Sequence, residues 1–254
     1  MERSRVFTYS LKLALRLVDT TTGKEVTGYG LEIRMDGAAE RFTLKGGVLI
    51  FQELEKRAFQ MEVSTFAYEP VSMPVDLDTL DKNLPMIEIH LIPSDGHPGR
   101  MELLMMKGTF PGIEELCAVR MQDNVCMIRD FDPGKRLMKI FNPHRLALDR
   151  VFYALVDPDE KVFESFRILR VEDDQIAKID RVLETRFRNY FPVTPVVFGQ
   201  VRPDGSYCLR VRDDWENAQW LVRWSAEGKT YYRVFDLHEE KELPMEREEG
   251  SVLV

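Results

Sequence analysis

The first ninety residues alternate between hydrophobic and polar positions with a period of two. Within 9–19, leucines occupy positions 11, 13, 15 and 17, while Lys12 and Arg16 fall between them. A strand with one buried face has this period, because successive side chains point to opposite sides. Six further segments of this kind are separated by turn residues, at 31–35, 41–44, 48–51, 59–65, 71–77 and 86–92. The pattern predicts an N-terminal seven-stranded β-sandwich, whose sheets bury their apolar faces against each other.

A clear boundary follows this sandwich. Two prolines and two glycines lie within residues 92–99, together with polar residues that end a strand. We therefore predict a sandwich at 1–94, a linker at 95–99, a second β-rich domain at 100–237 and an acidic tail at 238–254. The tail lacks a hydrophobic pattern, which is typical of a flexible end or a short docking segment.

The second domain is also expected to consist mainly of strands. One hairpin is predicted from 196–201 and 207–211, around Pro203-Asp204-Gly205. Another is predicted from 219–224 and 230–237, around a turn that contains Glu227-Gly228. Turn residues of this kind end one strand and begin the next.

Residues 174–190 form the ambiguous segment of this domain. Ile176, Ile179, Leu183, Phe187 and Tyr190 recur at the spacing of a helical stripe, and an aspartate at 173 or 174 would cap its start. However, Ile179, Leu183 and Phe187 also share one face of a strand. The pattern favours one helix, with a strand as the alternative. The fold class is thus mainly β, with a sandwich followed by a β-rich domain that contains one candidate helix.

The first domain resembles the carboxypeptidase regulatory-like, or transthyretin-like, sandwich domains. The residues that match the pattern of these domains are Thr21, Gly23 and Val26 in a turn, then Gly47, Phe51, Leu54, Phe59, Met61 and Val63, and the corner Tyr68-Glu69-Pro70. At 55–57 the chain has Glu-Lys-Arg, where these domains usually have Pro-Gly before the aromatic strand. The resemblance implies a non-catalytic accessory or adhesion module.

Composition and charge narrow the expected partners. Hydrophobic residues make up 44% and charged residues 31% of the 254 residues, which is typical of a globular protein. The formal net charge of -8 disfavours general attraction to nucleic acid or anionic lipid. Lys12 and Arg16 interrupt the apolar N-terminal stretch, so no signal peptide is predicted, and no run is long enough to cross a bilayer. We expect a cytoplasmic protein without membrane insertion, which could leave the cell as part of a particle.

The titratable residues do not form a catalytic or metal-binding motif. The histidines and cysteines are scattered, at His90, His97, His144, His238, Cys117, Cys126 and Cys208. Aspartates occur in pairs at 76 and 78, 130 and 132, 157 and 159, and 213 and 214. Turns collect aspartate because its side chain caps backbone amides, so we interpret the pairs as turn residues. No catalytic residue, metal ligand or cofactor is predicted.

Aromatic residues cluster late in the chain, at Trp215, Trp220, Trp224 and Tyr231. Packing in a core is the interpretation that the pattern favours. The functional alternative is an exposed aromatic platform that binds a partner or a sugar.

These observations favour a non-catalytic structural or adaptor subunit that binds other proteins in a larger assembly. Sandwich modules of this type often occur in phage-tail-like or contractile injection particles, and this association is part of the hypothesis. One alternative is a carbohydrate- or peptide-binding module. Another is an enzyme whose site in the second domain is assembled from residues far apart in the sequence.

Overall fold

The computed structural model describes residues 11–253, apart from 29, 95–96, 98–102, 122–125, 144–147, 149, 174, 189, 214–217 and 245–251. The chain divides into two compact units. The first comprises Met1–Asp19 with Glu25–Pro98, and the second comprises Thr20–Lys24 with Gly99–Val254. Regular structure in the described residues is nearly all β strand, with short 3-10 turns at η1 (Leu77–Thr79) and η2 (Thr185–Arg188). The prediction of a mainly β protein is confirmed.

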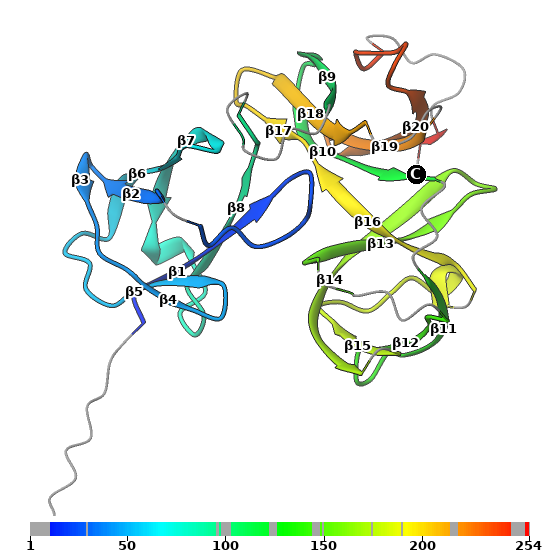
Figure 1. Cartoon of the computed structure of the whole chain (residues 1–254), viewed down its shortest axis with the longest axis horizontal. Coiled ribbons are helices and arrows are strands. Elements are labelled where there is room, and N and C mark those ends of the chain that lie inside the picture. Colours follow the sequence, from blue (N-terminus) through cyan, green and yellow to red (C-terminus); the bar gives the residue numbers. More distant parts are fainter. Residues whose placement is uncertain are drawn as a thin grey trace, which may run out of the picture. The chain divides into compact units, whose positions relative to one another are not determined.

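The first unit is a sandwich of two sheets (Figure 1). One sheet has the order β4 (Thr43–Lys45), β5 (Val48–Phe51), β1 (Leu13–Asp19), β8 (Met86–Leu91). The other has the order β3 (Ala38–Ala39), β2 (Glu32–Met35), β6 (Ala58–Thr65), β7 (Tyr68–Asp76). Leu13, Leu15 and Leu17 of β1 are fully buried in the shared core, as their alternation predicts. The seven expected strands are present in the described residues, together with one short strand that was not expected, the two-residue β3.

The second unit contains a closed barrel, formed by the green and yellow strands at the lower right of Figure 1. Its described strands follow the order β11 (Cys126–Asp132), β12 (Leu137–Phe141), β15 (Ile176–Ile179), β14 (Val162–Asp173), β13 (Phe152–Asp157), β16 (Pro192–Phe198). The start of β16 pairs back with β11, which closes the ring. All these pairings are antiparallel, and the inward side chains fill one hydrophobic core.

The end of β16 continues into a second layer of the same unit. It pairs with β10 (Ile113–Arg120), which is followed in the sheet by β19 (Gln219–Ala226), β20 (Lys229–Asp236) and β21 (Val252–Leu253). A separate sheet consists of β17 (Gln200–Val201), β18 (Ser206–Arg212) and β9 (Leu103–Thr109). The two layers enclose another hydrophobic core. The predicted hairpin of β19 and β20 forms. The other forms as β17–β18, with a first arm shorter than the expected 196–201, because 196–198 belongs to β16 and pairs with β10.

The helix favoured at 174–190 is wrong for the described part of that segment, which excludes residues 174 and 189. Ile176–Ile179 forms β15, which pairs with both β12 and β14. Leu183 and Phe187 are buried in the barrel core from the turn that follows. Barrel closure overrides the helical period here, because β15 supplies the backbone partners that β12 and β14 would otherwise lack.

The described part of the acidic tail is packed against the second unit. Leu243 is 3% exposed and belongs to the core between the two layers. Its backbone N–H donates to the Tyr207 hydroxyl at 2.7 Å. Lys107 of β9 donates its N–H to the carbonyl of Lys241 at 3.0 Å, and β21 pairs with β20. The described residues of this segment therefore dock on the edges of β9 and β20. Residues 245–251 lie outside the described residues.

Candidate binding groove

The late aromatic residues that the structure describes do not form an exposed platform. Trp220 and Trp224 are 4% and 2% exposed and lie in the core between the two layers. Tyr231 is half-buried and stacks on Trp224, with ring centroids 5.4 Å apart. Trp215 lies outside the described residues. For Trp220 and Trp224, burial agrees with the favoured interpretation of core packing, and the alternative of partner binding is corrected, because the hydrophobic gain from burying an indole favours the core position.

The histidines take part in local contacts that lie apart from one another. His90 contacts the Glu88 carboxylate at 3.1 Å, and His238 contacts that of Asp213 at 3.3 Å. The ring of His97 meets the edge of Tyr68. His144 is outside the description. Within the described residues, no group of three or more His, Cys, Asp or Glu side chains is arranged to hold a metal ion.

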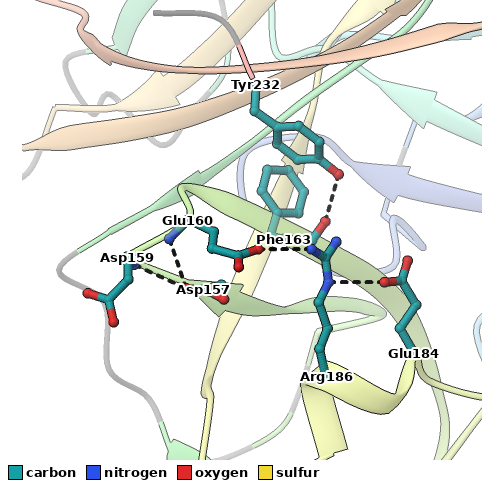
Figure 2. Close-up of polar contacts among 7 residues, drawn as sticks. All are labelled: Asp157, Asp159, Glu160, Phe163, Glu184, Arg186 and Tyr232. Carbon is teal, nitrogen blue, oxygen red and sulfur yellow. Dashed lines mark hydrogen bonds and ion pairs between the residues drawn. The ribbon is translucent and has the colours of Figure 1, made fainter. Parts of the chain in front are cut away.

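The carboxylates of Asp157, Glu160 and Glu184 are engaged in structural contacts (Figure 2). Asp157 accepts hydrogen bonds from the N–H groups of Asp159 and Glu160, at 3.1 and 3.0 Å, so it caps the turn after β13. Arg186 bridges the carboxylates of Glu160 and Glu184, at 3.1 and 3.0 Å. This geometry agrees with the interpretation of Asp157 and Asp159 as turn residues.

Burial shifts the pKa of two cysteines and one glutamate of the second unit. Burial raises the pKa of the Cys117 and Cys126 thiols to about 12, so neither is a nucleophile at neutral pH. Burial also raises the pKa of Glu164, whose carboxylate accepts the N–H of Glu184 at 2.9 Å. Both thiols pack in the hydrophobic core of the barrel.

The best candidate for a functional site is a groove on the outer wall of the barrel, where β11, β12 and β15 lie side by side. Its volume is about 470 Å³, and its lining includes Arg129, Asp130, Lys139, Gln175, Ile176 and Tyr190. In the strand register, Lys139 lies between Asp130 on one side and Ile176 on the other. The Lys139 ammonium forms an exposed ion pair with Asp130 at 3.4 Å. The sheet thus places a cation, a carboxylate and an apolar side chain in one row.

Tyr190 borders this groove from the segment between η2 and β16. Its N–H donates to the Ile128 carbonyl at 2.8 Å, and the Ile128 N–H donates to the Phe191 carbonyl at 2.9 Å. The Tyr190 side chain is 74% exposed, although its backbone has a φ of 64°. A left-handed conformation costs a non-glycine residue about 1–3 kcal/mol. The fold holds this residue in a strained conformation without gaining buried ring area.

Met127 and Phe141 form an exposed apolar pair on β11 and β12, two of the strands that line the groove. They face each other in the β11–β12 ladder and are 37% and 55% exposed. The next pair, Ile128 and Ile140, points inward and is buried in the barrel core. Since successive strand residues point to opposite faces, Met127 and Phe141 must point outward. Two large apolar side chains therefore lie together on the outer wall.

The sequence interpretation missed the groove residues as a site. It assigned Tyr190 to a helical stripe and Asp130 to a turn, whereas Asp130 lies in β11. One signal was present: Met127 and Phe141 are apolar residues at the outward positions of strands whose inward positions are already apolar. The positive φ of Tyr190 and the adjacent positions of β11, β12 and β15 in the sheet could be seen only in the structure.

No protein-family model matches the chain, and none of the curated proteins matches its sequence. The resemblance of the first unit to carboxypeptidase regulatory-like domains therefore stays a prediction. In the part of the chain that the structure describes, no helix has the length and apolar character needed to span a membrane.

Proposed function

We propose that this chain is a non-catalytic structural or adaptor subunit of a larger assembly, and that it holds a macromolecular partner at the groove on its barrel wall. The supporting observation is a hollow of about 470 Å³ that is lined by the exposed Tyr190, while the strands β11 and β12 that line it also present the exposed apolar pair Met127 and Phe141. Large aromatic side chains at the centre of an interface supply most of its binding free energy. Exposed apolar groups gathered in this way mark an interaction surface.

The lining of the groove favours binding over hydrolysis. Among the described residues, the lining includes a single carboxylate, that of Asp130, which is already paired with Lys139. Glycoside hydrolysis typically requires two carboxylates on opposite sides of the scissile bond. The groove is therefore suited to holding a ligand and not to cleaving it.

The strand edges favour a partner that is held by side chains. The edge strand β7 contains Pro70 and Pro74, which lack the N–H needed to pair with an added strand. On the second unit, the carbonyl of Lys241 pairs with β9, and β21 pairs with β20. Edge pairing is thus blocked or occupied at these strands, and the barrel wall is the better docking surface.

An affinity pull-down from the native host, with mass spectrometry and native-mass sizing, tests this function. The wild-type chain should be recovered with a stoichiometric partner in a large particle, such as a phage-tail-like or contractile injection particle. The Met127→Ser/Phe141→Ser variant should recover the partner at least tenfold less well, because removing interface anchors costs about 2 kcal/mol or more.

The matched control is Phe66→Ser, which removes an exposed phenylalanine from the first unit. It should retain the partner at the wild-type level. Recovery of the wild-type chain as a free monomer, or equal recovery by the wall variant, would contradict the proposal.

A further inference from the structure

The groove presents a mixture of hydrogen-bond donors and acceptors. Arg129 and Lys139 donate, the Asp130 carboxylate accepts, and the Gln175 amide can do both. These groups come from neighbouring strands and from the residue that precedes β15, so they converge on one hollow. A ligand that fits this lining must itself donate and accept hydrogen bonds at several adjacent positions.

Much of the backbone around the groove is engaged in strand pairing, apart from the irregularity between Ile128 and Asp130. β11 pairs with β12 and β16, β12 pairs with β11 and β15, and β15 pairs with β12 and β14. An extended peptide that binds by strand addition needs an exposed edge, which these strands do not offer along their paired residues. Recognition at this site must therefore depend on side chains.

Tyr190 supplies the one exposed aromatic ring in the described lining. Its backbone is tied to β11 at Ile128 and holds the left-handed conformation described above. Strained residues that the surrounding structure maintains are concentrated at binding sites. The ring offers an apolar face next to the polar row formed by Asp130 and Lys139.

We propose that the groove binds a carbohydrate, with a sugar ring stacked on Tyr190 and its hydroxyls bonded to Asp130, Lys139 and Gln175. A sugar hydroxyl both donates and accepts, which matches the mixed lining, and the C–H face of a sugar ring is apolar, which matches the tyrosine. The volume of about 470 Å³ lies within the range of about 300–1,000 Å³ that is typical of small-ligand sites. This assignment rests on the proposed binding function and names the ligand class.

The test uses the full chain on a glycan array of neutral, amino and acidic sugars, followed by saturation-transfer NMR with the best binders. The decisive variant is Tyr190→Gly, which removes the ring and also relieves the left-handed backbone, since glycine adopts positive φ readily. It should fold at least as stably as the wild-type chain and bind the sugar at least tenfold more weakly.

Glu227→Gly is the matched control. Glu227 also has a positive φ, 52°, but lies in the turn between β19 and β20. Its replacement relieves strain in the same way and should leave sugar binding unchanged. A second variant, Asp130→Asn, should weaken binding several-fold while the circular dichroism spectrum is retained.

The outcomes separate the ligand class from the proposed function. An array on which the wild-type chain binds no glycan overturns the carbohydrate assignment, as does binding that Tyr190→Gly leaves intact. If the array is blank but the pull-down recovers a protein through Met127 and Phe141, the binding function stands and the ligand is a protein. If both experiments are negative, the proposed function fails as well.

Discussion

Replacing Leu243 with alanine should destabilise the second unit, although the residue lies in the acidic tail. Leu243 packs in the core between the two layers, and its N–H donates to the Tyr207 hydroxyl. Truncation of a buried leucine to alanine costs about 2–5 kcal/mol in free energy of unfolding. We expect a loss of about 2–3 kcal/mol, at the lower end of this range.

The hydrogen bond adds a second, separable contribution. Tyr207→Phe removes the acceptor and leaves the buried N–H of Leu243 without its partner, which costs about 1–3 kcal/mol. The double variant should lose less than the sum of the two single variants, because either change releases the same docked segment. Additive losses would show that the segment docks through the two contacts independently.

Urea unfolding followed by tryptophan fluorescence measures these losses. All tryptophans lie at 215, 220 and 224, so the signal reports the second unit. A lower midpoint with an unchanged slope indicates a loss of stability. Leu169→Ala is the control, because this leucine of β14 is exposed and its truncation should cost less than about 0.5 kcal/mol. If Leu243→Ala behaves like Leu169→Ala, the tail is not docked as described.

Three further predictions concern buried polar groups. Cys117 and Cys126 should resist iodoacetamide at about pH 8 until the chain is unfolded, because burial raises their pKa to about 12; rapid alkylation of the folded protein, seen by mass spectrometry, would contradict this. Burial raises the pKa of Glu164 in the folded protein, so the folded state favours the protonated carboxyl. The stability that this preference provides is fully present below the ordinary glutamate pKa, and it is lost as the pH rises through the pKa of Glu164 in the folded protein. Glu164→Gln should therefore stabilise the protein at about pH 7 but not at about pH 4 in thermal unfolding, and an equal effect at both would refute the assignment. Tyr232→Phe should cost about 1–2 kcal/mol in urea unfolding, because its hydroxyl donates to the buried Phe163 carbonyl at 3.0 Å (Figure 2), and no change would show that this bond is unimportant.

Local patterns were sufficient to predict most strands. The leucines of β1 alternate because one sheet face is buried, and this signal is complete within seven residues. The β17–β18 and β19–β20 hairpins were predicted for a similar reason, since Gly205 and Gly228 supply the positive φ of each turn. Such features depend on neighbours in the sequence.

The barrel and the groove depend on neighbours in space. β15 was interpreted as helix because its spacing fits both periods, and only pairing with β12 and β14 decides between them. Closure of the ring needs Cys126 to meet Val193, which lies 67 positions later in the chain. The groove unites residues of β11, β12 and β15 with Tyr190, and no local pattern connects them. Late tryptophans gave an aromatic signal, but aromatic composition does not tell a core from a surface.

The most direct test of the account is site-specific photo-cross-linking in extracts of the native host. A benzophenone amino acid at position 141, at the end of the β12 strand that lines the groove, should form a defined adduct with the bound partner, protein or glycan. The same amino acid at position 66, an exposed site in the first unit, should form none. Adducts at 66 and not at 141, or none at either position, would contradict the claim that this chain works by holding a partner at its barrel wall.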